Sequence, residues 1–202
     1  MGTSSASVEA GGVFCVLGRL RRTRGCIFSY KHNLLCLCAS GRLLYWGSME
    51  MCVRTHSEEE TRRLGCRIGE RLVGGEVIAL FGELGTGKTV LTQGIARGAG
   101  VPESVYVTSQ TFTLMRSYPG RVLVHHIDLY RLSGPEEALL RGVDEVLGDP
   151  DGVAVIEWAE RAELPEARLD VILTHVSPEE REVEVIPHGS GAERLCEGLC
   201  SC

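Results

Sequence analysis

Residues 82–89 read Gly-Glu-Leu-Gly-Thr-Gly-Lys-Thr and match the pattern G-x-x-x-x-G-K-[ST], in which four positions are fixed. The pattern is typical of a phosphate-binding loop, or P-loop, because its glycines let backbone N–H groups converge on a β-phosphate. Lys88 would neutralise β- and γ-phosphate oxygens, and the Thr89 hydroxyl would bind Mg²⁺. We therefore predict a Mg-ATP site here, in preference to a glycine-rich turn with an incidental lysine.

Two acidic residues are candidates for the rest of such a site. A P-loop needs an acid that holds the metal or its waters, and a group that positions the attacking water. Asp128 and Glu157 each come directly after an apolar run, so both should emerge at the carboxyl edge of a sheet, where a nucleotide lies. The alternative is that they are ordinary end-of-strand acids that make caps or salt bridges. Their spacing does not rank the two.

The elements that must position these residues follow the order strand, loop, helix. The apolar run 76–81 predicts a buried parallel strand, and it leads through the glycines into a helix at 90–97. The runs 122–127 and 153–156 predict two further strands, with a helix at 135–147 between them. All three strands would belong to one sheet.

Helix and hairpin signals frame this region. Ser57 and Glu60 have the spacing of a capping box at a helix start. One face of that helix is marked by Leu64, Ile68 and Leu72. Segments 168–174 and 182–186 alternate apolar with polar residues, as an antiparallel hairpin does. The predicted fold class is α/β, a P-loop NTPase-like three-layer fold with a mostly parallel, mixed-edge central sheet.

Three residues near the acids have readings that the sequence leaves open. His125 and His126 lie inside the strand before Asp128, where alternation sends one side chain to each face. We interpret them as packed core histidines, in preference to a ligand or a base. Trp158 either stacks on an adenine or covers the edge of the sheet.

Four segments together resemble one family. They are Thr-His-Ser-Glu-Glu-Glu-Thr at 55–61, the P-loop, Ser-Gln-Thr-Phe-Thr-Leu at 109–114 and His-Ile-Asp-Leu-Tyr-Arg-Leu at 126–132, followed by Ile-Glu-Trp at 156–158. From residue 53 to residue 187 the chain resembles the TsaE (YjeE) family. The resemblance implies a P-loop ATPase, weak alone, that supports turnover of the TsaB–TsaD complex, which makes threonylcarbamoyladenosine (t6A) in tRNA. It implies ATP and Mg²⁺ as cofactors, TsaD and TsaB as partners, and only indirect contact with tRNA.

The resemblance also implies residue roles. Lys88, Asp128 and Glu157 would be catalytic, with Asp128 needed for hydrolysis, while Thr89 and Glu157 would hold the metal. The nucleotide would be bound by Glu58, Glu83, Gly85, Thr86, Gly87, Lys88, Thr89, Val90, Ser109, Thr111 and Trp158. Residues 109–113 would form a switch near the γ-phosphate. Gln110 stands where the family usually has proline, and the loss of a fixed φ predicts a looser switch.

Charge and composition predict how the chain is organised. The formal net charge of −6 argues against a large basic surface that would bind nucleic acid by itself. Residues 1–50 hold six Lys or Arg and two acidic residues, whereas 51–202 hold fifteen and twenty-five. The 202 residues suffice for one core of ordinary domain size. We predict an N-terminal extension of uncertain status at 1–50, consistent with a mis-assigned start, a P-loop ATPase domain at 51–188 and a flexible tail at 189–202.

The cysteines and the apolar segments predict the compartment. Eight of the nine cysteines lie in the first 52 or the last seven residues, which is typical of free thiols in a reducing compartment. Their spacing does not predict a metal site. The apolar run 26–46 is interrupted by charged and polar residues, so we predict no membrane span and a cytoplasmic protein.

Two other functions remain as alternatives. A small-molecule kinase shares the P-loop but would transfer the γ-phosphate to an acceptor. A nucleotide-dependent binding module would sense ATP and reshape a partner without turnover.

Overall fold

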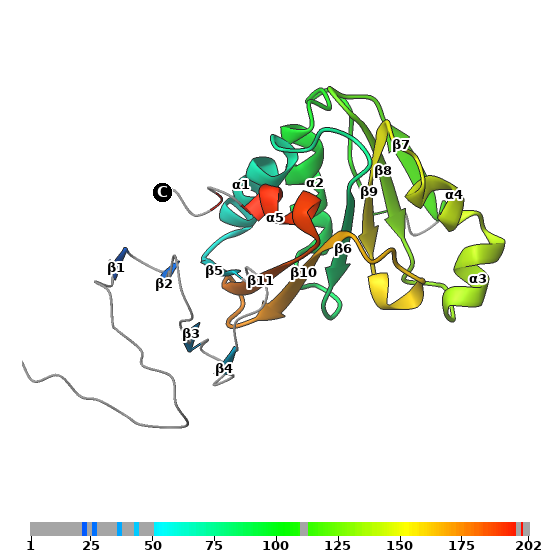
Figure 1. Cartoon of the computed structure of the whole chain (residues 1–202). Helices are drawn as coiled ribbons and strands as arrows, with labels where there is room; N and C mark the ends of the chain where they lie inside the picture. Colours follow the sequence, from blue (N-terminus) through cyan, green and yellow to red (C-terminus); the bar gives the residue numbers. More distant parts are fainter. Residues whose placement is uncertain are drawn as a thin grey trace, which may run out of the picture. The chain divides into compact units, whose positions relative to one another are not determined.

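A computed structural model of the chain describes residues 51–109, 113–196 and 199, together with four two-residue strands nearer the N-terminus (Figure 1). The chain divides into two compact units, residues 1–46 and 47–202. In the first unit, the described elements are two antiparallel strand pairs. They are β1 (Arg22–Thr23) with β2 (Cys26–Ile27), and β3 (Cys36–Leu37) with β4 (Leu43–Leu44).

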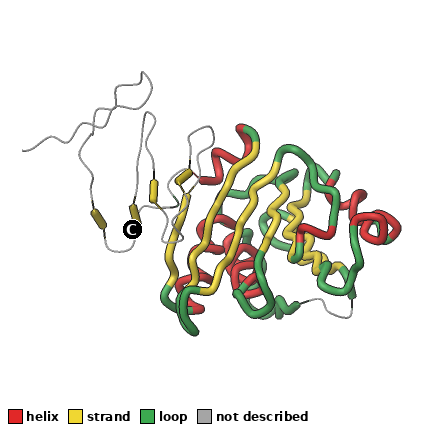
Figure 2. Tube along the Cα trace, turned by 90° about the horizontal axis from the view of Figure 1, so that it is seen from below, coloured by secondary structure: helices red, strands yellow, loops and turns green. Residues whose placement is uncertain are grey.

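The second unit is built on a seven-stranded sheet of order β5-β11-β10-β6-β9-β8-β7, whose strands lie side by side in Figure 2. The strands are β5 (Met51–Thr55), β6 (Val77–Phe81), β7 (Met115–Tyr118), β8 (Leu123–Asp128), β9 (Gly152–Glu157), β10 (Arg168–His175) and β11 (Arg181–His188). Strands β10, β6, β9 and β8 run parallel, whereas β7 at one edge and β11 with β5 at the other pair antiparallel. The predicted mixed-edge sheet is confirmed.

Helices cover both faces of this sheet (Figure 1). On one face lie α1 (Glu58–Gly69), α2 (Lys88–Gly98) and α5 (Ser190–Cys196). On the other lie α3 (Pro135–Leu140), α4 (Val143–Leu147) and the 3₁₀ helix η1 (Ala159–Arg161). Alternate residues of β6 serve the two cores: Ile78 and Leu80 pack with α1 and α2, and Val77 and Ala79 with α3 and α4. The three-layer prediction is therefore confirmed.

Helices α1 and α2 meet at their backbones. A Cβ on Gly65 would lie 2.3 Å from the Leu91 carbonyl oxygen, and one on Gly94 would lie 2.1 Å from the Arg62 carbonyl oxygen. Gly69 and Gly98 make equally close approaches one turn further along. Because only glycine permits this distance, the four glycines fix α2, and with it the P-loop, against α1.

The helix predicted at 135–147 is interrupted in the structure. Gly142 has φ +74° and separates α3 from α4. A left-handed residue cannot continue an α-helix, and glycine adopts that conformation without steric cost. The apolar spacing alone predicts one helix, and the glycine divides it.

The flexible tail predicted at 189–202 is corrected for residues 190–196, which form α5. Ala192, Leu195, Cys196 and Leu199 are buried in the same core as α1 and α2. Their spacing of three, four and seven residues is that of one helical face, which the polar composition of the segment obscured. Residues 197, 198 and 200–202 lie outside the described part of the chain. None of the helices that the structure describes is long and apolar enough to cross a membrane.

Candidate phosphate-binding site

The P-loop connects β6 to α2 with the backbone that its glycines predict. Gly82, Gly85 and Gly87 have φ of +137°, +82° and +100°, a region that favours glycine. A Cβ on Gly82 would also lie 2.4 Å from the Leu173 carbonyl oxygen. Gly87 begins α2 without a side-chain cap, so the first N–H groups of an eleven-residue helix are left to a ligand.

Lys88 lies inside the loop and is only 4% exposed. Its Nζ donates to the carbonyl oxygens of Gly82 at 2.6 Å and Glu83 at 2.9 Å. The same Nζ lies 3.9 Å from the centroid of the Trp158 ring. Burial lowers the pKa of the Lys88 ammonium, and the nearby carboxylates of Glu157, Glu160 and Asp128 oppose that shift. The chain itself therefore fixes the Lys88 ammonium inside the loop.

The two predicted acids lie side by side at the ends of neighbouring parallel strands. Asp128 ends β8, Glu157 ends β9, and the two residues are register partners. Both are buried, at 5% and 3% exposure. Thr89 Oγ1 donates to Glu157 Oε2 at 2.9 Å. A hydroxyl and a carboxylate oxygen at this distance are ligands that Mg²⁺ prefers, so the residues present fit the predicted metal site.

Asp128 is engaged with the chain on both of its oxygens. Ser109 Oγ donates to Oδ2 in a short hydrogen bond, and the Tyr130 N–H donates to Oδ1 at 3.1 Å. The predicted switch segment thus begins at a contact with Asp128. Thr111 lies outside the described residues. The structure brings Ser109 to the site, and residues 110–112 of the switch lie outside the described part of the chain.

Both histidines of β8 are buried, because β8 is covered on both faces. His126 Nε2 lies 2.9 Å from Glu157 Oε1. His125 contacts Asp149 and Ser117 instead, away from the acids of the site. The interpretation of His126 as a packed core residue does not include this contact with Glu157. Strand alternation does place His126 on the same face as Asp128, two residues further on.

Trp158 has φ +60°, the single positive value among the non-glycine residues that the structure describes. The centroid of its ring lies 5.0 Å from the centroid of the Tyr130 ring and 5.2 Å from Arg161 Cζ. The Lys88 ammonium lies over the same ring. The Arg161 guanidinium in turn donates to the carbonyl oxygens of Leu129, Tyr130 and Leu132. Trp158 therefore joins the P-loop to the chain that follows Asp128.

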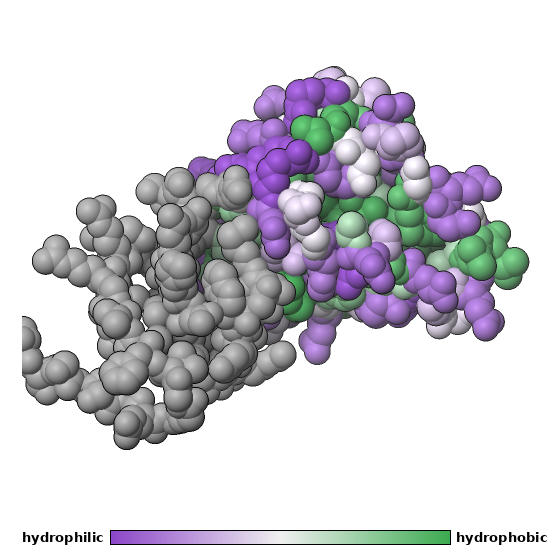
Figure 3. All heavy atoms as spheres, in the orientation of Figure 1, coloured by the Kyte–Doolittle hydropathy of each residue, from purple (hydrophilic) through white to green (hydrophobic). Residues whose placement is uncertain are grey.

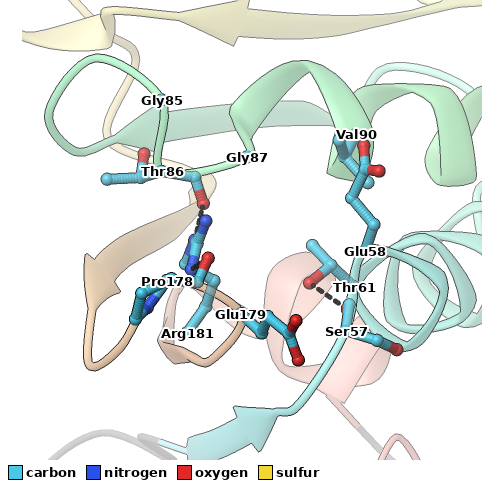
Figure 4. Close-up of a pocket in the computed structure, with 10 residues that line it drawn as sticks. All are labelled: Ser57, Glu58, Thr61, Gly85, Thr86, Gly87, Val90, Pro178, Glu179 and Arg181. Carbon is cyan, nitrogen blue, oxygen red and sulfur yellow. Dashed lines mark hydrogen bonds between the residues drawn. The ribbon is translucent and has the colours of Figure 1, made fainter.

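A pocket of about 550 Å³ lies beside the P-loop (Figure 4). Its lining includes the predicted residues Glu58, Gly85, Thr86, Gly87 and Val90, and also Ser57, Thr61, Pro178, Glu179 and Arg181. Its volume is that of a small-molecule site. Trp158 is not among the lining residues, whereas Glu83 is exposed on the loop and contributes its carbonyl oxygen to Lys88.

Part of this pocket comes from the β10–β11 turn, which no sequence motif predicts. Figure 4 shows Arg181 reaching from β11 to the P-loop, where its Nε donates to the Thr86 carbonyl oxygen at 3.1 Å. Because β10 runs parallel to β6 and next to it, the turn after β10 lies at the same sheet edge as the loop after β6. That neighbour relation, and not a local motif, was the missing signal.

A glycine loop between a buried strand and a helix, with acids at the ends of the adjoining parallel strands, places this chain in the P-loop NTPase-like class. The family model described as "Threonylcarbamoyl adenosine biosynthesis protein TsaE" matches residues 55–183. The chain belongs to the TsaE family.

Individual relatives agree with this assignment. The chain is 37% identical over 149 residues to the tRNA threonylcarbamoyladenosine biosynthesis protein TsaE of Bacillus subtilis, covering 72% of this chain and 91% of that protein. It is 40% identical over 136 residues to the protein of the same name from Treponema pallidum, covering 66% and 98%. The crystal structure of YdiB from Bacillus subtilis matches with a TM-score of 0.62 and 32% identity, covering 76% of this chain and 96% of that chain.

Proposed function

We propose that this chain binds Mg-ATP in its P-loop and hydrolyses it to ADP and phosphate, as the ATPase component of the machinery that makes t6A in tRNA. The observation that carries the proposal is the contact of Thr89 with Glu157 beside the buried Lys88. The names of the family and of its relatives supply the biological process. A bound Mg²⁺ would neutralise negative charge on the phosphates.

The side chains divide the work at the phosphates. Thr89 and Glu157 hold the metal with oxygen ligands, and Lys88 leaves the carbonyl oxygens of Gly82 and Glu83 to bind phosphate oxygens. Asp128 accepts a hydrogen bond from the attacking water, and Ser109 must release its oxygen for that purpose. Hydrolysis by the isolated chain is therefore slow, and a partner that moves the switch accelerates it.

The pocket beside the loop takes the sugar and the base. It adjoins Gly85 and Thr86, and Glu58 and Glu179 supply carboxylates that accept hydrogen bonds from ribose hydroxyl groups. Val90 gives the base an apolar contact. Trp158 contacts Lys88 and does not line the pocket. It therefore contributes to nucleotide binding by positioning Lys88, and not by stacking on adenine.

The proposed partners are the TsaD and TsaB proteins, and the chain contacts tRNA only indirectly, through their complex. Figure 3 shows an apolar area over α3, where Leu139 and Leu140 are 60% and 85% exposed. Exposed apolar patches are typical of protein contact sites, and the acids Glu136 and Asp144, nearby in the sequence, are also exposed. The acidic balance of residues 51–202 disfavours direct capture of tRNA. We propose a cytoplasmic location with no membrane contact.

The test is t6A formation on tRNA by purified TsaB–TsaD and its carbamoyl donor system, followed over many turnovers. The reaction is run with the wild-type chain, with Lys88→Ala, or with no addition. Repeated turnover with the wild type only supports the proposal. Equal t6A yields in all three reactions overturn it, and a phosphorylated small molecule in place of free phosphate would indicate a kinase.

A second candidate function is a nucleotide-dependent binding module that works without turnover. The observation that favours it is that both carboxylate oxygens of Asp128 accept hydrogen bonds from the chain. An acid used in this way would hold the switch segment in place and would not activate water. Asp128→Ala separates the two functions. Loss of both hydrolysis and t6A turnover supports the ATPase, whereas loss of hydrolysis with normal t6A turnover supports the module.

A further inference from the structure

His126 is a buried polar residue for which the proposed reaction has no role so far. It lies in the middle of β8, is 0% exposed, and shares its strand face with Asp128. Its Nε2 lies 2.9 Å from Glu157 Oε1. Its Nδ1 is the only buried side-chain nitrogen or oxygen in the described part of the chain that has no hydrogen-bond partner.

The contact with Glu157 assigns the proton on this ring. A carboxylate oxygen only accepts, so Nε2 carries the hydrogen and donates it, and in the neutral ring Nδ1 is then a bare acceptor. The opposite tautomer would set a lone pair against a carboxylate and bury an N–H group with no acceptor, at a cost of about 1–3 kcal/mol. The geometry therefore selects one neutral tautomer.

Glu157 is held on both of its oxygens by this arrangement. Oε1 accepts from His126 and lies 3.4 Å from Thr92 Oγ1, which itself donates to the Lys88 carbonyl oxygen at 3.0 Å. Oε2 is left to Thr89 at the start of α2. The carboxylate cannot rotate without losing the His126 hydrogen bond, so Oε2 is kept pointing at the proposed cation.

We infer that His126 is a positioning residue that orients Glu157 for a divalent cation. The inference rests on the proposed function for the identity of the ligand, Mg²⁺ held with a nucleotide. A residue kept only for packing would be apolar, because an imidazole with an unpartnered nitrogen costs free energy in a core. That cost is offset if the ring fixes a metal ligand, as partners behind metal ligands do.

The experiment measures nucleotide binding with and without the metal. The full chain, His126→Leu and His126→Gln are titrated with a fluorescent ATP analogue in EDTA, and then with Mg²⁺ at fixed nucleotide. His126→Leu should weaken the apparent Mg²⁺ affinity by about 10–100-fold, since it removes the partner of a metal ligand. Its Mg-free nucleotide affinity should stay within about twofold, and His126→Gln, whose amide donates, should recover part of the loss.

The matched control is His125→Gln, which changes the neighbouring buried histidine whose partners are Asp149 and Ser117. It should leave Mg²⁺ affinity unchanged. Unchanged Mg²⁺ affinity in His126→Leu, or an equal loss of nucleotide affinity in EDTA and in Mg²⁺, would overturn the inference alone. Nucleotide binding by the wild type that ignores Mg²⁺ would overturn the proposed function as well.

A second measurement uses the wild-type chain and needs no variant to fold. The nitrogen-15 chemical shifts of an imidazole differ among its two neutral tautomers and its doubly protonated form, so NMR tells the three apart. The inference expects His126 as the Nε2–H tautomer, with its Nε2 signal shifting when Mg²⁺ and nucleotide are added. A proton on Nδ1, or a ring signal indifferent to the metal, contradicts it.

Discussion

At the scale of single residues, Lys88 and Trp158 hold their positions through contacts within the protein. The Lys88 ammonium already has two carbonyl partners and an aromatic ring. At the proposed site a phosphate would replace these neutral acceptors with charged ones, whose hydrogen bonds are roughly twice as strong. Trp158 is held at φ +60°, a conformation that costs a bulky residue about 1–2 kcal/mol. Strain of this kind persists at functional sites, which favours a role for Trp158 in the response to nucleotide.

The pair formed by His125 and Asp149 predicts an acid-sensitive contribution to stability. A hydrogen bond from His125, followed by one from the Asp151 N–H, holds the pKa of Asp149 below its ordinary value of 3.8. Since the pKa is lower in the folded chain, the contribution is present above about pH 4 and disappears as the pH falls through the folded pKa. Urea unfolding of the wild type and Asp149→Asn between pH 3 and pH 7 should show a difference in unfolding free energy that shrinks below pH 4.

His125→Ala is the partner control for that measurement. It removes the hydrogen bond and should flatten the acid dependence in the same pH range as Asp149→Asn. A wild-type curve whose acid slope is unchanged by either substitution would show that the pair does not supply it.

What the sequence could predict at this scale depends on whether a residue belongs to a local motif. Lys88 and Thr89 stand in fixed positions of a pattern, and Asp128 and Glu157 end apolar runs, so all four were placed at one sheet edge. Their roles stay predictions. Arg181 and the Glu157 contact of His126 were missed, because each contact joins strands whose adjacency is set by the sheet order.

At the scale of elements, the closest contact is the crossing of α1 and α2. Gly94→Ala would place a Cβ 2.1 Å from the Arg62 carbonyl oxygen, a backbone atom that cannot move aside without separating the helices. We expect a loss of about 3 kcal/mol in unfolding free energy, at the upper end of overpacking. Urea denaturation measures it. Gly191→Ala in α5, where nothing lies within 4 Å, is the control and should be neutral or slightly stabilising.

Because α1 lines the pocket through Glu58, Gly94→Ala should also weaken nucleotide binding in the folded fraction. A stability equal to that of Gly191→Ala would mean that the helices do not meet at the distance described.

Helix α5 predicts an unreactive thiol. Burial raises the pKa of Cys196 to about 11, and Glu193 adds to the shift, so the thiol stays protonated at neutral pH. Alkylation with iodoacetamide at pH 8, read by peptide mass spectrometry, should leave Cys196 protected in the native chain and labelled in urea. Leu195→Ala should speed native labelling by undocking the helix. Native labelling at the rate seen in urea would support the flexible tail that the composition suggested.

The predicted elements divide by how they are buried. Strands β6, β8 and β9 are covered on both faces and read as continuous apolar runs, which made them recognisable. Strands β5 and β7 lie at the two edges, carry polar residues and were not predicted. An edge strand is stabilised by pairing with a neighbouring strand, and a single sequence does not show which strand that is.

At the scale of the whole molecule, the site and the family match fall in one of the two units. The family model covers residues 55–183, inside the unit 47–202. That unit has its own sheet, two cores and the complete P-loop. A unit with its own core is expected to fold independently of the rest of the chain.

This independence is tested by two deletions that differ by nine residues. Removal of 1–46 leaves β5 in place and should keep both the melting temperature and the nucleotide affinity of the full chain. Removal of 1–55 also deletes β5, which pairs with β11 and packs Met51 and Val53 against the core. It should lower the unfolding free energy by about 3 kcal/mol, because full burial of one such side chain contributes about 1.5–3 kcal/mol and these two are partly buried.

Thermal unfolding of the three chains in parallel separates the contributions of the first unit and of β5. Deletion of 1–55 also removes the hydrogen bond between the Thr55 and Thr61 hydroxyl groups, which joins β5 to α1 beside the pocket. Its nucleotide affinity should therefore fall together with its stability. If deletion of 1–46 alone produced both losses, the first unit would have to support the P-loop unit, and the independence argued from the separate core would be wrong.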